Sequence, residues 1–175
     1  YVEAIAADML GAHFPPSLHD DICASIGLEL PAGIPEPDPD PANPRDPQFR
    51  QKVIRAYEYR CAITGWNLRL EHSLAGLEAA HIKWHVSGGP CVEQNGLALN
   101  SLHHKLFDLG AFTLSKDEHP VVLVSQLAHG DDAVRELLIK LHGIPIREPQ
   151  NRRWLPSHEF IDWHQKQVFK APARH

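Results

Sequence analysis

Apolar residues at helical spacing and short apolar runs occur along this chain, a combination that predicts an α+β fold. Helices are predicted over residues 2–10, 18–26, 47–59 and 101–109, from about 131 to 141, and from 157 onward. Strands are predicted over residues 77–82, 111–114 and 121–124, whereas 97–99 is long enough only for the end of a strand. Ser17 and Ser157 stand where N-capping residues are expected, and Gly110 is expected to stop the helix before it.

Prolines divide the chain into parts. Residues 31–47 contain seven of the fifteen prolines, mixed with Glu and Asp, and this composition predicts an extended, solvated connector. The chain is therefore expected to consist of an N-terminal helical segment over residues 1–30, the connector, and a domain over residues 48–175. It begins at Tyr1 rather than at a Met, which favours a piece of a longer protein.

Composition excludes several classes of protein. Hydrophobic residues make up 43% and charged residues 22% of the chain, as in a globular protein. No apolar run approaches the roughly 20 residues of a membrane span, and no signal-peptide pattern opens the chain. The cysteines at positions 23, 61 and 91 form neither an even framework nor a paired metal motif. We therefore expect reduced thiols in a cytoplasmic protein with no membrane partner.

A His, an Asn and a second His stand at positions 81, 95 and 104, and these residues carry the candidate chemistry. His81 lies at the end of a predicted strand, and a histidine near its ordinary pKa can take a proton from water at neutral pH. His104 and Asp108 are about one helical turn apart, so they share a helix face and can bind one metal ion. Hydrolysis of a phosphodiester requires both an activated water and neutralisation of phosphate charge.

The spacing of these positions resembles the HNH nuclease signature, in which a ββα-metal core holds one divalent ion against a phosphodiester. The resemblance implies that His81 is the general base and that His104 binds the metal. It also implies that Asn95 is a scaffold residue whose amide ties down the loop and orients His81. Surrounding helices and a small antiparallel hairpin are expected to embed this core. The segments that look most like the C-terminal HNH domain of McrA-type, modification-dependent restriction endonucleases are residues 55–65, 78–85, 88–90 and 95–112.

The chain also departs from the commonest HNH pattern. Many members carry an acidic residue or His where this chain has Ala80, so the metal site is expected to be completed by water or phosphate oxygens. Many members hold a structural zinc with two Cys-x-x-Cys pairs, and the corresponding positions here are Cys61, Thr64, Asn100 and His103. We expect no structural zinc, and hydrogen bonds of Asn100 and His103 in its place. The expected cofactor is one divalent ion, Mg, Mn, Co or Ni, with Zn as an occupant of that site in crystals.

The net charge of -5 argues against a free-standing DNA-binding protein, because affinity for DNA comes mainly from Lys and Arg. Acidic residues gather in the connector, however, while basic residues surround the motif and favour a local basic face. Lys83, His85 and Lys105 are candidate substrate-binding residues, and a solvated side chain is the alternative for each. An N-terminal domain that recognises modified DNA would supply further affinity, and double-strand cleavage would favour a homodimer.

Two classes of function follow. The first is a metal-dependent DNA endonuclease domain, and the resemblance implies that it serves a restriction enzyme for phosphorothioated or methylated DNA. The second is a noncatalytic DNA- or partner-binding module that keeps the HNH fold, an alternative raised by Ala80. Asp108 has its own alternative, in which it pairs with a basic neighbour instead of a metal. Cleavage of supercoiled plasmid with and without a divalent metal separates the two classes.

Overall fold

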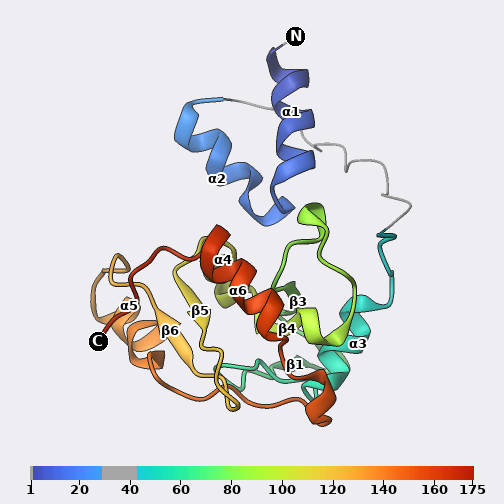
Figure 1. Cartoon of the computed structure of the whole chain (residues 1–175), viewed down its shortest axis with the longest axis vertical. Helices are drawn as coiled ribbons and strands as arrows, with labels where there is room; N and C mark the ends of the chain where they lie inside the picture. Colours follow the sequence, from blue (N-terminus) through green and yellow to red (C-terminus); the bar gives the residue numbers. More distant parts are fainter. Residues whose placement is uncertain (1, 29–42) are drawn as a thin grey trace.

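The computed structural model describes residues 2–28 and 43–175, in which short strand pairs lie among helices (Figure 1). In chain order the elements are α1 (Val2–His13), α2 (Pro16–Ile26), α3 (Phe49–Ala56), β1 (Arg69–Leu70), β2 (Ser73–Leu74), β3 (Leu77–His81), η1 (His85–Ser87), η2 (Glu93–Asn95), β4 (Gly96–Asn100), α4 (Ser101–Asp108), β5 (Phe112–Leu114), β6 (Val122–Val124), α5 (Asp132–Leu137), η3 (Ile139–Leu141), η4 (Arg152–Trp154) and α6 (His158–Gln167), where η marks a 3-10 turn. None of the helices in these ranges is long and apolar enough to cross a bilayer.

The N-terminal helices α1 and α2 form a hairpin that stands above the other elements (Figure 1). Helix α2 contacts α4, and α1 contacts the turn η1. Most of the predicted connector, up to residue 42, lies outside the described residues. The division into residues 1–30, 31–47 and 48–175 therefore stays a prediction.

An antiparallel strand pair and the helix that follows it form the centre of the molecule. Strands β3 and β4 pair along their whole length, with His81 opposite Gly96 and Leu77 opposite Asn100. Helix α4 begins at the next residue, and Asn100 caps it by accepting a hydrogen bond from the backbone N–H of His103 at 2.9 Å. This is the predicted ββα arrangement. The expectation that 97–99 forms only a strand end is wrong, because β4 is a full partner of β3.

Apolar side chains between α3, the strand pair and α4 form the main core. Leu97 on β4 and Phe107 on α4 are fully buried, and burial of each stabilises the fold by roughly 1.5–3 kcal/mol. Gly96 permits the close approach of α3, because a Cβ there would lie 2.3 Å from Val53 Cγ2. The core thus fixes how α3 and α4 lie on the strand pair.

A second antiparallel pair flanks this core. Strands β5 and β6 pair as predicted, and α6 packs against β5. The helix predicted to run from 131 to 141 begins as expected, because the Asp131 side chain caps α5 by accepting from the backbone N–H groups of Ala133 and Val134. It breaks at Leu138, whose φ of -134° and ψ of -56° leave the helical region, and η3 follows.

His164 of α6 joins three elements. Its ring stacks on Phe107 of α4 with centroids 3.8 Å apart, and its Nε2 donates to the Phe107 carbonyl oxygen at 3.1 Å. A carbonyl oxygen can only accept, so Nε2 carries the proton and Nδ1 accepts from the Thr113 hydroxyl of β5 at 2.9 Å. The buried imidazole therefore holds α4 and β5 against α6.

Local predictions at helix ends differ from the structure. Helix α2 begins before Ser17, so Ser17 lies inside the helix and is not its cap. Ser157 is the N-cap residue of α6, but its side chain makes no capping hydrogen bond. The helix predicted over 47–59 is shorter because Glu58 and Tyr59 take positive φ values of 53° and 59°, which end a right-handed helix.

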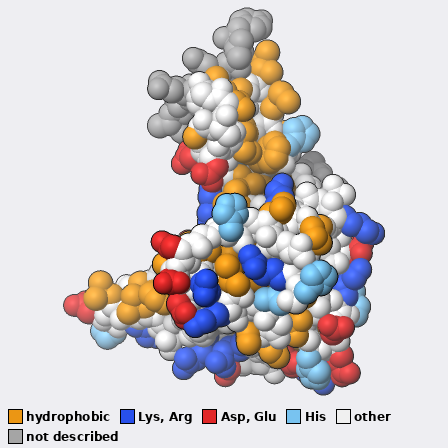
Figure 2. Space-filling model, turned by 90° about the vertical axis from the view of Figure 1, so that its left-hand side faces the viewer, with side chains coloured by type: hydrophobic (Ala, Val, Ile, Leu, Met, Phe, Trp, Pro, Cys, Tyr) orange, Lys and Arg blue, Asp and Glu red, His pale blue; other side chains and the backbone are white. Residues whose placement is uncertain are grey.

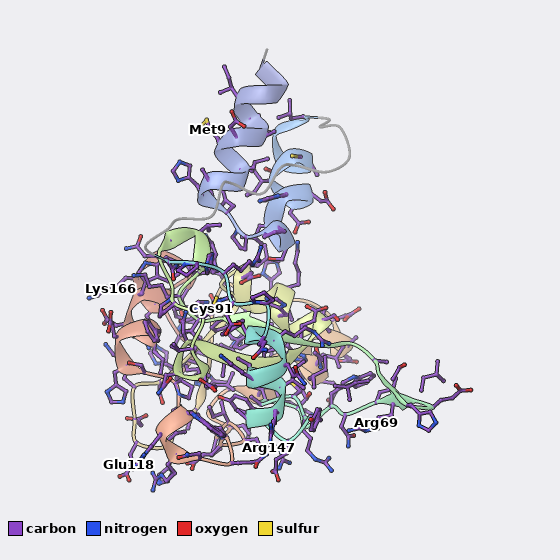
Figure 3. All side chains as sticks on the ribbon, turned by 90° about the vertical axis from the view of Figure 1, so that its right-hand side faces the viewer. Met9, Arg69, Cys91, Glu118, Arg147 and Lys166 are labelled. Atoms are coloured by element: carbon purple, nitrogen blue, oxygen red, sulfur yellow. The ribbon has the colours of Figure 1, made fainter. Side chains whose placement is uncertain are left out.

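A short hairpin without a predicted counterpart projects from the body. Strands β1 and β2 pair antiparallel, and Figure 3 shows them on an arm, with Arg69 labelled. The arm is anchored by the Arg69 guanidinium, which lies 5.6 Å from the centroid of the Tyr59 ring, while Leu70 is 74% exposed. The strands are only two residues long, so periodicity gives little signal for them.

The burial of His164 predicts a pH-dependent stability. Burial lowers the pKa of His164 to about 3, so the native state keeps the ring neutral while the unfolded chain protonates it below about pH 6.5. The unfolded state binds more protons in this interval, and the free energy of unfolding therefore falls as the pH decreases from about 6.5 toward 3.

Urea denaturation measures the free energy of unfolding at about pH 7.5 and at about pH 5. Between these pH values, the free energy of unfolding of His164→Gln should fall by about 2 kcal/mol less than that of the parent. Gln retains an N–H donor for the Phe107 carbonyl, so the variant keeps the main polar contact. His72→Gln, at an exposed position, is the control and should match the parent. Equal losses in His164→Gln and the parent would contradict the prediction.

Candidate active site

The structure brings the three motif residues to one part of the core. His81 is the last residue of β3, Asn95 ends the turn that leads into β4, and His104 lies on α4. Strand β3 contacts α4, and Glu78 of β3 lies 2.6 Å from His104 Nδ1, so His81 and His104 belong to elements that pack directly on one another. The fold therefore assembles the site that the spacing predicts.

Asn95 is buried, and its side-chain amide ties down the loop after β3. Its Oδ1 accepts from the Lys83 backbone N–H at 2.8 Å, and its Nδ2 donates to the carbonyl oxygens of Lys83 and Pro90, each at 2.9 Å. The loop is so tight that a Cβ on Gly89 would lie 1.9 Å from the Lys83 carbonyl oxygen. These are the scaffold contacts expected of Asn95, and they fix the backbone just after His81.

His81 is held from two sides. Its ring stacks on Phe49 of α3, with centroids 3.9 Å apart and an interplanar angle of 16°, and its Nε2 lies 3.6 Å from Cys91 Sγ. Burial lowers the pKa of His81 to about 3, and neighbouring cationic groups, His85 among them, act in the same direction. The imidazole is therefore neutral at pH 7 and able to accept a proton, but its pKa is not the ordinary value assumed from the sequence, so His81 is a weaker base than an exposed histidine.

His104 has a carboxylate at each ring nitrogen. Nδ1 lies 2.6 Å from Glu78 Oε2, and because an ionised carboxylate only accepts, Nδ1 carries the proton. Nε2 lies 3.4 Å from Asp108 Oδ2, one helical turn further along α4. With Nδ1 engaged, Nε2 keeps a lone pair for a metal ion, and Glu78 fixes the orientation of the ring, as carboxylates do for many metal-binding histidines.

Glu78 is a candidate site residue that the motif spacing does not include. Partial burial raises the pKa of Glu78, but hydrogen bonds from Ser101, at 2.6 Å, and from His104 outweigh it, so the pKa lies below its ordinary value. Side chains alternate along a strand, so Glu78 and Ala80 share one face of β3. This alternation is the sequence signal that could have identified Glu78. It places a carboxylate two residues before Ala80, on the strand face where Ala80 itself has none.

Asp108 is 3% exposed and hydrogen-bonded on both carboxylate oxygens. Trp84 Nε1 donates to Oδ1 at 3.2 Å, and the Ser17 hydroxyl donates to Oδ2. Burial raises the pKa of Asp108, while His104, Ser17 and Trp84 act in the opposite direction. A buried carboxylate is costly as an anion unless it is paired, so Asp108 gains from a cation at this position.

His104 Nε2 and Asp108 Oδ2 form a donor set that fits one divalent ion. Their 3.4 Å separation allows both atoms to contact one ion at ordinary distances of about 2.0–2.2 Å. Each Asp108 oxygen has lone-pair capacity beyond the hydrogen bond that it accepts, and the nitrogen and oxygen donors suit Mg, Mn, Co or Ni. Within the described ranges no three His, Cys, Asp or Glu side chains converge on a metal position, so water or phosphate would complete the coordination.

The candidate substrate-binding residues have different surroundings. Lys105 Nζ is paired with Asp21 Oδ2 of α2 at 2.5 Å, whereas the His85 ring lies beside His81 with centroids 5.7 Å apart. Lys83 is half-buried, and its backbone is held in the loop after β3. Figure 2 shows Lys, Arg and His side chains among acidic ones on one face of the body. Substrate binding by these three residues stays a prediction.

Hydrogen bonds connect the positions where the resemblance places zinc ligands. Asn100 Oδ1 and His103 Nδ1 are 2.8 Å apart, His103 Nε2 lies 2.8 Å from the Leu137 carbonyl oxygen, and Asn100 Nδ2 donates to Thr64 Oγ1 at 3.4 Å. Cys61 is fully buried in the core. The hydrogen bonds expected of Asn100 and His103 are therefore present and pin the start of α4. That the protein needs no structural zinc stays a prediction.

Comparisons with known proteins identify the segment that carries these residues. Residues 61–115 match the model of a family described as HNH endonuclease, and this segment contains His81, Asn95 and His104. No curated protein sequence matches the chain. Among solved structures, a modification dependent TagI restriction endonuclease is similar at 20% sequence identity and a TM-score of 0.49, over 83% of this chain and 42% of that one. The chain thus spans less than half the length of that protein.

Metal binding should depend on His104 and, through it, on Glu78. In calorimetric titrations with Mn²⁺, His104→Ala should lose the site because one of its two protein ligands is gone. Glu78→Ala should bind about 10- to 100-fold more weakly, the usual cost of removing the carboxylate that orients a ligating histidine. The exposed His72→Ala is the control. Unchanged affinity in His104→Ala would show that the ion binds elsewhere.

Proposed function

We propose that the chain is a divalent-metal-dependent DNA endonuclease domain, because residues 61–115 match the model of the HNH endonuclease family. One observation carries the proposal. A neutral His81 ends strand β3, with the following loop fixed by Asn95, and β3 packs on α4, which carries the His104–Asp108 pair that fits a metal ion. A general base next to a cation is the arrangement that hydrolysis of a phosphodiester requires.

In the proposed reaction, His81 takes a proton from the water that attacks phosphorus, the bond from phosphorus to O3′ breaks, and O3′ takes a proton from solvent. The products are a 5′-phosphate and a 3′-hydroxyl. The stack with Phe49 and the loop contacts of Asn95 keep the imidazole in one orientation, so little freedom is lost on reaching the transition state. A divalent ion would supply positive charge that stabilises the phosphate and the leaving oxygen. His104 and Asp108 are the residues that would hold it.

Recognition of a particular DNA is proposed to come from outside this core. A nuclease core contacts mainly phosphate and sugar, which carry no base information. The net charge of -5 also limits the affinity that this chain has for DNA by itself. We assign Lys83, His85 and Lys105 to phosphate contacts, and Lys105 has to leave Asp21 to make one.

The segments that resemble McrA-type enzymes favour a role as the cleavage domain of a modification-dependent restriction enzyme in the cytoplasm. In this proposal an N-terminal domain recognises phosphorothioated or methylated DNA and delivers it to the nuclease core. Two copies in a homodimer would place one active site on each strand of the duplex.

Ala80 favours a second candidate, a noncatalytic DNA- or partner-binding module with the same fold. Ala80 is fully buried and contributes no metal ligand where an acid is common in the HNH pattern. Glu78 lies on the same strand face, but its carboxylate accepts from His104 Nδ1 and so does not add a metal ligand. The two candidates differ in whether the parent chain cleaves DNA with any divalent ion.

Plasmid cleavage should separate the base from the scaffold. With saturating Mn²⁺, His81→Ala should retain metal and DNA binding yet cleave about 10²-fold or more slowly, the usual scale for loss of a general base. Asn95→Ala should also cleave on the order of 10²-fold more slowly at nearly normal metal affinity, because it acts through geometry. The exposed His129→Ala is the control.

Two outcomes of this assay would decide against the proposal. Parental cleavage rates in His81→Ala would remove His81 from the mechanism. A parent that binds DNA but cleaves it with none of Mg²⁺, Mn²⁺, Co²⁺ or Ni²⁺ would favour the noncatalytic module.

Dependence on DNA modification should appear only with the recognition domain present. This chain alone should cleave unmodified, methylated and phosphorothioated plasmids at similar rates, because its core is proposed to contact phosphate and sugar. A longer protein that contains the chain should prefer one of the modified plasmids. A preference shown by the chain alone would instead place recognition in the core, and no preference in the longer protein would contradict the restriction role.

A further inference from the structure

Helix α2 docks on the body with two pairs of residues, a polar pair that contacts the active-site helix α4 and an apolar pair that packs around Trp84. Ser17 and Asp21 form a polar pair, and Leu18 and Ile22 form an apolar pair. The members of each pair are four positions apart and so share a helix face. Figure 1 shows the hairpin directly above the part of the body that contains α4, and Figure 2 shows hydrophobic side chains at the junction between hairpin and body.

The apolar pair fastens α2 over Trp84. Leu18 is 6% exposed and forms a buried cluster with Trp84 and Val168, against which Ile22 also packs. Phe14, just before α2, adds a ring contact to Trp84, with centroids 6.4 Å apart. Burial of Leu18 alone stabilises this docked position by roughly 1.5–3 kcal/mol.

The polar face of α2 reaches the carboxylate proposed as a metal ligand. The Ser17 hydroxyl donates to Asp108 Oδ2, the oxygen that lies 3.4 Å from His104 Nε2. The other oxygen, Oδ1, accepts from the indole N–H of Trp84, the side chain that Leu18 covers. Helix α2 therefore influences both oxygens of Asp108, one directly and one through Trp84.

We propose that α2 is part of the metal site and that Ser17 is a positioning residue for Asp108. This inference rests on the proposed function, in which Asp108 binds a divalent ion. Hydrogen bonds to both oxygens fix the carboxylate plane with Oδ2 toward His104, so the ligand is already oriented when the ion arrives. Without the Ser17 hydroxyl the carboxylate regains rotational freedom, and ordering it on binding reduces the affinity.

The lone pairs of Asp108 Oδ2 indicate whether the Ser17 hydroxyl positions this oxygen for a metal ion or blocks it. A hydroxyl that blocked the site would compete with the ion, and its removal would tighten metal binding. Each oxygen of an ionised carboxylate can accept more than one partner, and the Ser17 hydroxyl uses only one of those positions on Oδ2. Removal of the hydroxyl should therefore weaken metal binding.

The test compares Ser17→Ala, Ser17→Thr and Ser25→Ala in the whole chain by calorimetric titration with Mn²⁺. Ser17→Ala should bind about 10- to 100-fold more weakly, the usual effect of losing a residue that orients a metal ligand. Ser17→Thr keeps a hydroxyl and should recover most of the affinity. Ser25→Ala should match the parent, because Ser25 is exposed on the same helix and donates to the Ile22 carbonyl. Ala favours helix, so α2 should remain folded, as circular dichroism can verify.

Two results would overturn this inference alone. Parental affinity in Ser17→Ala would show that Asp108 is positioned without α2, and tighter binding would show that Ser17 competes with the ion. Both leave the proposed function intact if the parent binds Mn²⁺ and His104→Ala does not. A parent that binds no Mn²⁺ would overturn the inference and the metal dependence of the proposed function together.

Discussion

The antiparallel register between β3 and β4 is the constraint on which the site depends. It places His81 opposite Gly96. Asn95, one residue before Gly96, therefore lies within reach of the loop that follows His81. The same register leaves Glu78 facing α4, where it meets His104. A slip of one residue would turn Glu78 to the opposite face of the strand. The core contacts that fix the register therefore also fix the chemistry.

His164, which packs against α4, and His104, which lies on α4, take different roles because their neighbours differ. His164 donates Nε2–H to the Phe107 carbonyl, and burial lowers its pKa to about 3, so it serves as a neutral link between elements. His104 donates Nδ1–H to Glu78 and directs Nε2 toward Asp108. In each ring, an oxygen acceptor determines which nitrogen carries the proton. Of the two rings, His104 has a carboxylate at its other nitrogen, whereas His164 has the Thr113 hydroxyl there. The partners of the two ring nitrogens distinguish the proposed metal ligand from a structural histidine.

Motif spacing was sufficient to predict that His81, Asn95 and His104 meet, because they lie on consecutive elements whose connections are short. The contacts that complete the site join distant segments and leave no periodic signal. Ser17 has the residue type and position of an N-cap, and only the packed fold places its hydroxyl on Asp108, 91 positions away. Glu78 follows the strand period, but its role also requires knowing that α4 covers that strand face. Helix ends were missed where positive φ values, as at Tyr59, override an apolar helical pattern.

The charges around His104 connect the proposed metal site, which has few protein ligands, with the weak affinity for DNA that the net charge of -5 predicts. Glu78 and Asp108 place two carboxylates against His104, and Asp21 adds a third beside Lys105. These negatively charged carboxylates attract a divalent cation and repel the negatively charged phosphate. In the proposed function a bound cation reverses the local sign before a phosphate approaches, so metal binding and DNA binding strengthen each other as linked equilibria. In the same proposal, a separate recognition domain supplies the DNA affinity that these acidic surroundings reduce in the core.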